Sequence, residues 1–482
     1  MSMRFAVIGA GMAGILAVIK LREAGYDDLV VYEKADRVGG TWRENTYPGI
    51  ACDVPSHAYS YSFELNPDWS QRFSPGPEIQ AYFQGVADRH GVTERIRFGE
   101  ELTSCEFRDG RWHLRTATGT TDVVDVVIAA TGVLHHPNIP TFEGIETFEG
   151  AWFHSSRWDH SVPLDGRRVG VIGTGSTAVQ ITSALVERTA HFALFQRTAQ
   201  WVLPIDNPAF TDAEREAFRA DPAGTRTLHD HLSRAFRDAF SHAVIDVNSP
   251  RLAEIEAECL RNLEQHVTDP ILRERLRPTY RAACKRLIAS PDFYQKIQHP
   301  EAELVTAAIE RIEPKGVRTA DGVLHELDVL VSATGFRADR FVRPTTVLGR
   351  DSVDLDEVWR DGLLAYLSVA VPGFPNFFML NGPNGPIGNF SLIDIAEQQV
   401  GYILQLLEEI RSGRCREISP TWEATRNLEA ERREAAVGTV WVTGCTSWYL
   451  DRDGIPASWT FTFDRFRDEM AAPKLKAYEL IG

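Results

Sequence analysis

The sequence lacks closely spaced cysteines. Six cysteines are spread over 482 residues, and the nearest two, Cys259 and Cys284, are 25 positions apart. This spacing leaves no C-x-x-C pair, so we expect neither disulfide-reductase chemistry nor a disulfide framework. It also provides no zinc knuckle, and no cysteine or histidine cluster is typical of an iron–sulfur or haem site. We therefore expect no metal.

The sequence also lacks basic blocks and long hydrophobic runs. Acidic residues outnumber Lys and Arg by 67 to 51, a formal net charge of −16, which disfavours nucleic acid as a partner. No window approaches the ~20 consecutive apolar residues that a membrane helix requires, so no membrane partner is expected. An apolar run begins at Phe5, which leaves no room for a signal peptide. We expect a cytoplasmic protein, with a monomer as the default state.

A strand, a turn, a helix and a second strand are predicted at the N-terminus. The apolar run 5–8 enters a G-x-G-x-x-G motif formed by Gly9, Gly11 and Gly14. A helix is expected over 15–24, and a second strand over 29–32 ends at Glu33. Such glycines let the backbone approach a pyrophosphate at the helix N-terminus, and the acid accepts from a ribose hydroxyl pair. The first site is therefore predicted to bind an adenine dinucleotide with a free ribose.

The same pattern occurs a second time. The apolar run 169–172 enters a motif formed by Gly173, Thr174, Gly175, Ser176, Thr177 and Ala178. A helix to about residue 187 and a strand over 193–195 follow, and here a cation, Arg197, replaces the acid. An arginine favours a ribose 2′-phosphate, so the second site is predicted to prefer NADPH to NADH.

Two dinucleotide sites in one chain are typical of a flavoprotein that takes hydride from a nicotinamide. FAD at the first motif and NADPH at the second are the expected cofactors. Because disulfide, iron–sulfur and haem acceptors are disfavoured, dioxygen is the expected electron acceptor.

Two further segments repeat, and each is predicted to end one unit. Residues 125–132 and 328–335 are both buried-strand patterns closed by Thr-Gly, and Thr131 belongs to the first. We predict an α/β fold with two Rossmann-like dinucleotide-binding domains and a helical insertion at about 208–290, where strand signals are few. The predicted division is 1–140 for the first part of the FAD domain, 141–328 for the NADPH domain with its insertion, and 329–482 for the second FAD part and a C-terminal substrate-site segment.

A helix is predicted after a proline- and glycine-rich passage in the last third of the chain. Ser391 and Asp394 have the spacing of a capping box, and the helix is expected to run to about 410 and stop near Gly413. Its positive end would point at the flavin pyrimidine, with Asn389 and Phe390 on the flavin side.

Residues 148–159 resemble a family fingerprint. Phe148, Gly150, His154 and Trp158 match the F-x-G-x-x-x-H-x-x-x-W pattern of the Baeyer–Villiger monooxygenases, the type I, class B flavoprotein monooxygenases. The resemblance covers nearly the whole chain and includes the segments Gly39-Gly40-Thr41-Trp42, Tyr47-Pro48-Gly49, Cys52-Asp53, Cys284-Lys285-Arg286 and Ser447-Trp448-Tyr449. Two departures are Asp159 in place of proline and Ala51 where many relatives carry arginine.

The resemblance implies an NADPH- and oxygen-dependent enzyme with a small ketone as its substrate. Such an enzyme inserts one oxygen atom next to the carbonyl, through a C4a-peroxyflavin, to give an ester or lactone. It implies that Arg286, which we place in a helix-like stretch, is the active-site arginine, and that Asp53 lies by the flavin and orients it. It assigns Lys285 and Arg197, with Thr198, to the 2′-phosphate. Further cofactor contacts are expected at Gly40, Thr41, Trp42, Tyr59 and Trp448.

Two residues of the fingerprint receive structural roles. His154 is interpreted as a hinge element that couples the two domains, and Trp158 as a packing residue.

Two other functions remain open. A flavin monooxygenase that oxidises nitrogen or sulfur would share the fold and cofactors, but would not need the arginine. A non-catalytic flavin redox sensor would need neither the pair Lys285-Arg286 nor a second complete nucleotide module. Trp158 and this pair favour the ketone reaction.

Overall fold

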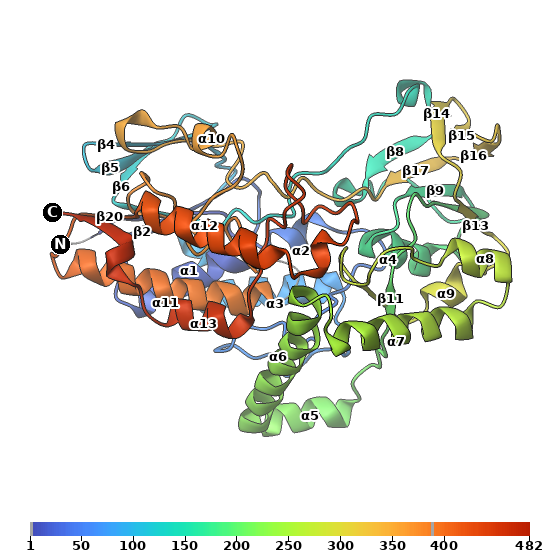
Figure 1. Cartoon of the computed structure of the whole chain (residues 1–482), viewed down its shortest axis with the longest axis horizontal. Coiled ribbons are helices and arrows are strands. Elements are labelled where there is room, and N and C mark those ends of the chain that lie inside the picture. The colour runs from blue at the N-terminus through green and yellow to red at the C-terminus, as the bar shows by residue number, and fades with distance from the viewer. Residues whose placement is uncertain (1–2, 387–389) are drawn as a thin grey trace.

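Two five-stranded parallel sheets form the framework (Figure 1). We describe them from a computed structural model, which covers residues 3–386 and 390–482. The strands of the first sheet are β1 (Phe5–Ile8), β2 (Leu29–Glu33), β3 (Ile96–Phe98), β7 (Val126–Ala129) and β19 (Phe377–Met379). Those of the second are β8 (Ala151–His154), β9 (Arg168–Ile172), β10 (His191–Phe195), β13 (Ala302–Val305) and β17 (Val329–Ser332). The predicted α/β class is confirmed.

The two sheets repeat one strand order. The first runs β19-β7-β1-β2-β3 and the second runs β8-β17-β9-β10-β13. In the first sheet, β1 enters the glycine motif and lies between β2, which follows the motif's helix, and β7, which ends in Thr-Gly. In the second sheet, β9 lies between β10 and β17 in the same way. The helices that follow the two motifs are α1 (Met12–Glu23) and α4 (Ser176–Leu185). The internal repeat read from the sequence is therefore a repeat of topology.

Each unit also carries an antiparallel meander before its Thr-Gly strand. The first meander contains β4 (Leu102–Arg108), β5 (Arg111–Thr116) and β6 (Thr121–Val124), extended by β18 (Thr346–Leu348). The second contains β14 (Ile309–Glu313), β15 (Gly316–Thr319) and β16 (Leu324–Glu326). In the first unit, the meander packs on one face of the parallel sheet, and α1, α3 (Gly76–Arg89) and α11 (Leu392–Arg411) pack on the other. Both faces are covered, which explains the continuous apolar runs of the parallel strands.

Glycine is required at the first position of both motifs. Gly9 has φ +98° and Gly173 has φ +121°, and a Cβ there would lie 2.7 Å from the Ala130 carbonyl oxygen and 2.3 Å from that of Ala333. The turn after β1 or β9 thus packs directly against the end of the neighbouring Thr-Gly strand.

The predicted boundary at residue 328 is wrong. Strand β17 (329–332) pairs with β8 and β9, so the chain leaves the second sheet only after Ser332. The Thr-Gly pattern closes the unit because its strand supplies a central position in the sheet. The remaining division into domains stays a prediction.

The insertion contains four helices, which are green in Figure 1: α5 (Asp212–Ala220), α6 (Pro222–Ile245), α7 (Pro250–His266) and α8 (Pro270–Arg275). On α7, Leu252, Ile255, Cys259 and Leu263 are buried, as the amphipathic spacing predicted. The predicted helical range extends too far, because residues 277–287 are irregular and β12 (Ile288–Ser290) pairs in parallel with β11 (Val202–Pro204).

The C-terminal helix α11 begins and ends close to the predicted positions, but its cap differs. Ser391 is the N-cap residue and makes no side-chain capping bond, so the predicted capping box is wrong. Asp394 instead lies 3.6 Å from Arg237 of α6, buried between the two helices. The other elements are α2 (Thr41–Glu44), α9 (Phe293–Lys296), α10 (Leu355–Val358), α12 (Trp422–Ala436), α13 (Phe463–Ala471), β20 (Glu417–Pro420) and β21 (Tyr478–Ile481).

Two chain segments connect the sheets, and they pair with each other. The first follows β7 and the second follows β17, and they meet in an antiparallel bridge between Pro137 and Phe336. The Asn138 N–H donates to the Gly335 carbonyl at 2.9 Å, and the Arg337 N–H donates to the His136 carbonyl at 2.8 Å. The link between the two units is thus double.

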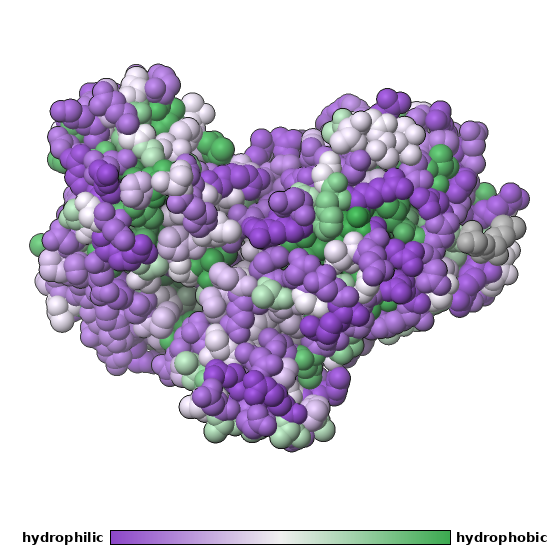
Figure 2. All heavy atoms as spheres, turned by 180° about the vertical axis from the view of Figure 1, so that it is seen from behind, coloured by the Kyte–Doolittle hydropathy of each residue, from purple (hydrophilic) through white to green (hydrophobic). Residues whose placement is uncertain are grey.

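The surface is mostly hydrophilic (Figure 2), and the hydrophobic residues visible on that face gather mainly in its recesses. Among the residues that the structure covers, no helix combines the length and the apolar character of a membrane span.

Candidate active site

A cavity of about 1290 Å³ is lined by both glycine motifs. The predicted residues that line it are Gly9, Gly11, Glu33, Gly40, Thr41, Trp42, Asp53, Tyr59, Thr131, Gly173, Thr174, Gly175, Ser176, Thr177, Arg197, Thr198, Lys285, Arg286, Phe390 and Trp448. Gly14 and Ala178 do not line it, since Gly14 packs on the Gly9 carbonyl and Ala178 is fully buried. Asn389 lies outside the described residues. One continuous space therefore collects nearly all predicted cofactor residues.

The first motif presents an uncapped helix start to this cavity. Helix α1 follows Gly11, makes no side-chain capping bond, and has no acidic residue in its first turn. Its free N–H groups and the positive end of its dipole fit an anionic pyrophosphate.

Glu33 is held at the end of β2 by protein donors. One carboxylate oxygen accepts from the Ala10 N–H at 2.8 Å, and the other accepts from the Ala35 N–H at 2.9 Å and from the Arg43 guanidinium at 3.0 Å. A carboxylate has about four lone-pair directions, so capacity remains for a ribose hydroxyl. Its predicted role stays a prediction.

Aromatic residues line the wall beyond the first motif. The indole N–H of Trp42 donates to the Tyr59 hydroxyl at 3.1 Å, and burial raises the pKa of Tyr59 well above its ordinary value. Phe390 is buried and packs against Phe463, with ring centroids 4.9 Å apart. This wall offers flat apolar surface and neutral polar groups, which suits a planar ring system.

The second motif repeats the uncapped helix start. Helix α4 follows Gly175, has no side-chain capping bond and no acidic residue in its first turn, and a Cβ on Gly175 would meet no protein atom within 4 Å. The Thr174 hydroxyl donates to the Thr198 carbonyl at 2.8 Å and so fixes the loop after β10.

Two cations stand near each other at the second motif. Burial lowers the pKa of Lys285, and the nearby charge of Arg197 lowers it further. Within residues 3–386 and 390–482, neither side chain forms a salt bridge with a carboxylate. Two uncompensated cations that repel each other form a site for a multiply charged anion.

Asp53 and Arg286 form an ion pair on the cavity wall. The Arg286 Nη2 and Nε donate to Asp53 Oδ2 at 2.6 and 3.1 Å. The carboxylate raises the pKa of Arg286 far above its ordinary value, so the guanidinium keeps its charge. Arg286 lies in a loop, two residues before β12, so the helix-like stretch predicted there is wrong. From this loop the side chain contacts Asp53, which lies 233 positions earlier in the sequence.

The fingerprint residues do not line the cavity. Phe148 packs against the second sheet, and Trp158 is buried with its ring 5.0 Å from that of Phe153. His154 is buried at the end of β8, and its Nε2 contacts the Gly335 carbonyl at 3.1 Å, in the second of the paired connections. Burial lowers the pKa of His154 to about 4, so the ring is neutral near pH 7. Its hinge role stays a prediction, and its position between the units is compatible with it.

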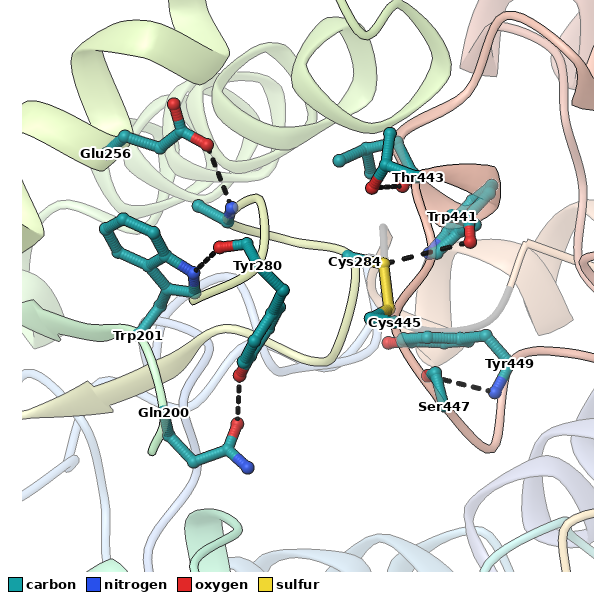
Figure 3. Close-up of a disulfide and its surroundings, with 12 residues drawn as sticks. Gln200, Trp201, Glu256, Tyr280, Cys284, Trp441, Thr443, Cys445, Ser447 and Tyr449 are labelled. Atoms are coloured by element: carbon teal, nitrogen blue, oxygen red, sulfur yellow. Dashed lines mark hydrogen bonds between the residues drawn. A yellow bond between two sulfur atoms is a disulfide. The ribbon is translucent and has the colours of Figure 1, made fainter. Parts of the chain in front are cut away.

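Sequence reasoning missed a disulfide beside the site. Cys284 and Cys445, 161 positions apart, are bonded (Figure 3), a single disulfide that the expectation of no disulfide framework did not anticipate. The bond ties the segment that carries Lys285 and Arg286 to the segment that carries Trp448 and Tyr449. Their separation in sequence left no local pattern to reveal the pair.

Sequence reasoning also missed a contact between the two units. The Tyr47 hydroxyl and the Gln180 amide oxygen lie 2.8 Å apart, and the Gln180 amide N–H donates to the Ala51 carbonyl at 3.0 Å. This contact fixes the start of α4 against the segment that precedes Asp53. Only the motif Tyr47-Pro48-Gly49 marked one side of it in the sequence.

A protein-family model matches the N-terminal part of the chain. The family described as flavin-binding monooxygenase-like matches residues 2–208. An uncharacterized monooxygenase of Mycobacterium tuberculosis is 48% identical over 477 residues, which cover 98% of this chain and 95% of the relative. A Baeyer–Villiger monooxygenase of Streptomyces coelicolor is 39% identical over 484 residues, which cover 99% of this chain and 92% of the relative.

Solved structures show the same similarity. A cyclohexanone monooxygenase from Rhodococcus sp. Phi1 bound to NADP+ is 30% identical with a TM-score of 0.88, and the match covers 100% of this chain and 99% of the other. OTEMO in complex with FAD and NADP is 26% identical, also with a TM-score of 0.88, and covers 99% of each chain.

Proposed function

Because the chain belongs to the Baeyer–Villiger monooxygenases, we propose that it uses FAD and NADPH to insert one oxygen atom of O2 between the carbonyl carbon and a neighbouring carbon of a ketone. Ketone, O2, NADPH and one proton are consumed, and ester or lactone, water and NADP+ are formed. The observation that carries this proposal is the Asp53–Arg286 ion pair, which lies on the wall shared by the dinucleotide cavity and a smaller apolar cavity.

The residues of the first motif fit FAD. The start of α1 after Gly11 would hold the pyrophosphate, Glu33 a ribose, and the wall of Trp42, Tyr59 and Phe390 the ring system. When bound and reduced, the flavin supplies activated oxygen. The protein would position the flavin, exclude water from it and place charged side chains beside it.

The residues of the second motif fit NADPH. The start of α4 would hold the pyrophosphate, and Arg197 with Lys285 would hold the 2′-phosphate, with Thr198 beside it. Trp448 lines the same cavity, is 40% exposed, and has the flat surface to cover the nicotinamide ribose.

Arg286 would stabilise the negative charge that develops on oxygen during attack on the ketone. A guanidinium is charged at every relevant pH and presents several N–H donors. Two of its nitrogens, Nε and Nη2, are held by Asp53, which fixes the direction of the third, Nη1, before substrate arrives. Such preorganised charge is the largest contribution that these residues can make to the rate.

The test is a panel of cyclic, linear and aryl ketones with amines and sulfides as competitors. We expect NADPH consumption to be slow without substrate and to rise with a ketone, and the product to gain one labelled atom under labelled dioxygen. Oxidation of the amines or sulfides without any ester would contradict the ketone reaction, and absence of bound FAD in the purified protein would contradict the whole proposal.

Arg197→Ala is expected to raise the KM for NADPH by about 10-fold or more and to leave the KM for NADH nearly unchanged, because charge-assisted bonds to a phosphate contribute roughly 1.5–3 kcal/mol. Steady-state NAD(P)H oxidation measures both constants. Arg188→Ala is the matched control, since Arg188 follows α4 but pairs with Asp165 at the surface. Equal effects of Arg197→Ala on the two cofactors would refute the 2′-phosphate assignment.

A further inference from the structure

A smaller, mostly apolar cavity adjoins the ion pair. Its polar lining groups are Asp53, Lys285, Arg286 and Tyr449, and its remaining lining side chains are hydrophobic. Phe236 and Phe240 reach it from α6 of the insertion. Among the lining side chains, the hydrogen-bond donors for the carbonyl oxygen of a ketone in this cavity are therefore Lys285, Arg286 and Tyr449.

Tyr449 is fixed beside Arg286. The residue is 3% exposed, and its ring lies on Trp448, with ring centroids 4.1 Å apart, and near Trp441. Figure 3 shows the ring beside the disulfide between Cys284 and Cys445, which holds its segment against the segment of Arg286. The phenol is thus preassembled with the guanidinium before substrate binds.

The Tyr449 phenol lies beside the charge of Arg286 and lines the cavity. Burial raises the pKa of Tyr449, and the nearby guanidinium acts on the phenol and opposes that rise without cancelling it, so the hydroxyl keeps its proton. Within the residues that the structure covers, no recorded acceptor takes this proton, and the side chain lines the cavity. A phenol beside a positive charge is a strengthened hydrogen-bond donor.

We propose that Tyr449 is a further catalytic residue, whose hydroxyl donates a hydrogen bond to the carbonyl oxygen of the ketone. The inference rests on the proposed function. The nearby positive charge of Arg286 strengthens the hydrogen bond that Tyr449 donates, and the apolar lining excludes water that would compete for it. No bond is broken in this step.

The test compares Tyr449→Phe with the wild-type holoenzyme. We expect the rate of flavin reduction by NADPH to change less than about twofold and ester formation to fall about 10- to 100-fold, with hydrogen peroxide accounting for the oxidised NADPH. Titration of the oxidised holoenzyme with a ketone that the wild type converts should show a dissociation constant raised about 5- to 10-fold, as expected for one lost hydrogen bond.

Two further variants separate this role from packing. Tyr402→Phe removes another buried hydroxyl, one that contacts Tyr478 and lines neither cavity, and should behave as the wild type does in every assay. Tyr449→Gln restores a donor without the ring and should recover part of the ester formation that Tyr449→Phe loses.

Undiminished ester formation in Tyr449→Phe would overturn the proposal. So would loss of FAD from both Tyr449 variants, because the residue would then be structural. A wild-type enzyme that forms no ester from any ketone would instead refute the proposed function itself, so the two failures are distinguishable.

Discussion

Replacing Arg286 with alanine is expected to reduce ester formation by about 10²- to 10³-fold while NADPH still reduces the flavin. The reason is electrostatic. Two of its nitrogens bond Asp53, so the charge is aimed before substrate binds, and the other cation that lines the smaller cavity, Lys285, is assigned to the 2′-phosphate. Anaerobic stopped-flow reduction and product analysis under air measure the two steps separately.

Arg281→Ala is the matched control for this experiment. Arg281 lies in the same loop, five positions earlier, but it bonds Glu256 at 2.6 Å and lines neither cavity. Its loss should leave ester formation nearly unchanged. If Arg286→Ala formed ester at the wild-type rate, or if both variants lost it equally, the assigned role of Arg286 would be wrong.

Reduction of the disulfide is expected to lower the free energy of unfolding by about 2 to 5 kcal/mol, because the bond closes a loop across 161 positions and restricts the unfolded chain. It should also lower ester formation, since it frees the Tyr449 segment from that of Arg286. Chemical denaturation with and without a thiol reductant measures the first effect, and product analysis measures the second.

A thiol count gives the direct check. The unreduced, unfolded protein should show four free thiols, those of Cys52, Cys105, Cys259 and Cys415. Six free thiols would show that Cys284 and Cys445 are not bonded. As a control, the double variant Cys284→Ser, Cys445→Ser should be insensitive to the reductant, and any remaining sensitivity would contradict the attribution to this bond.

The parts of the fold that could be predicted depend on short stretches of sequence. Each glycine motif has its strand, turn and helix within about 30 residues, and the close approach at Gly9 or Gly173 follows from that local geometry. The Thr-Gly repeat was equally local. The domain boundary predicted before β17 was wrong because β17 lies inside the second sheet, between β8 and β9.

The parts that could not be predicted depend on contacts between distant segments. Asp394 has the spacing of a cap, but α6 brings Arg237 to it and the capping bond is not made. Arg286 lies in a loop, and its neighbours come from distant segments: Asp53 bonds it, and Tyr449 is brought beside it by the disulfide. Family resemblance pointed to the ion pair, whereas Tyr449 as a donor emerges only from burial and the shape of the cavity.

The paired connections between the two sheets restrict how the sheets can move. A single tether would allow rotation in any direction, whereas two antiparallel tethers that are bonded to each other at Pro137 and Phe336 resist twisting and sliding. The disulfide and the ion pair between Asp53 and Arg286 link the two units again, at the cavity. We expect the two glycine motifs to keep one alignment with each other through repeated reactions, because links at separate places resist both twisting and separation of the units.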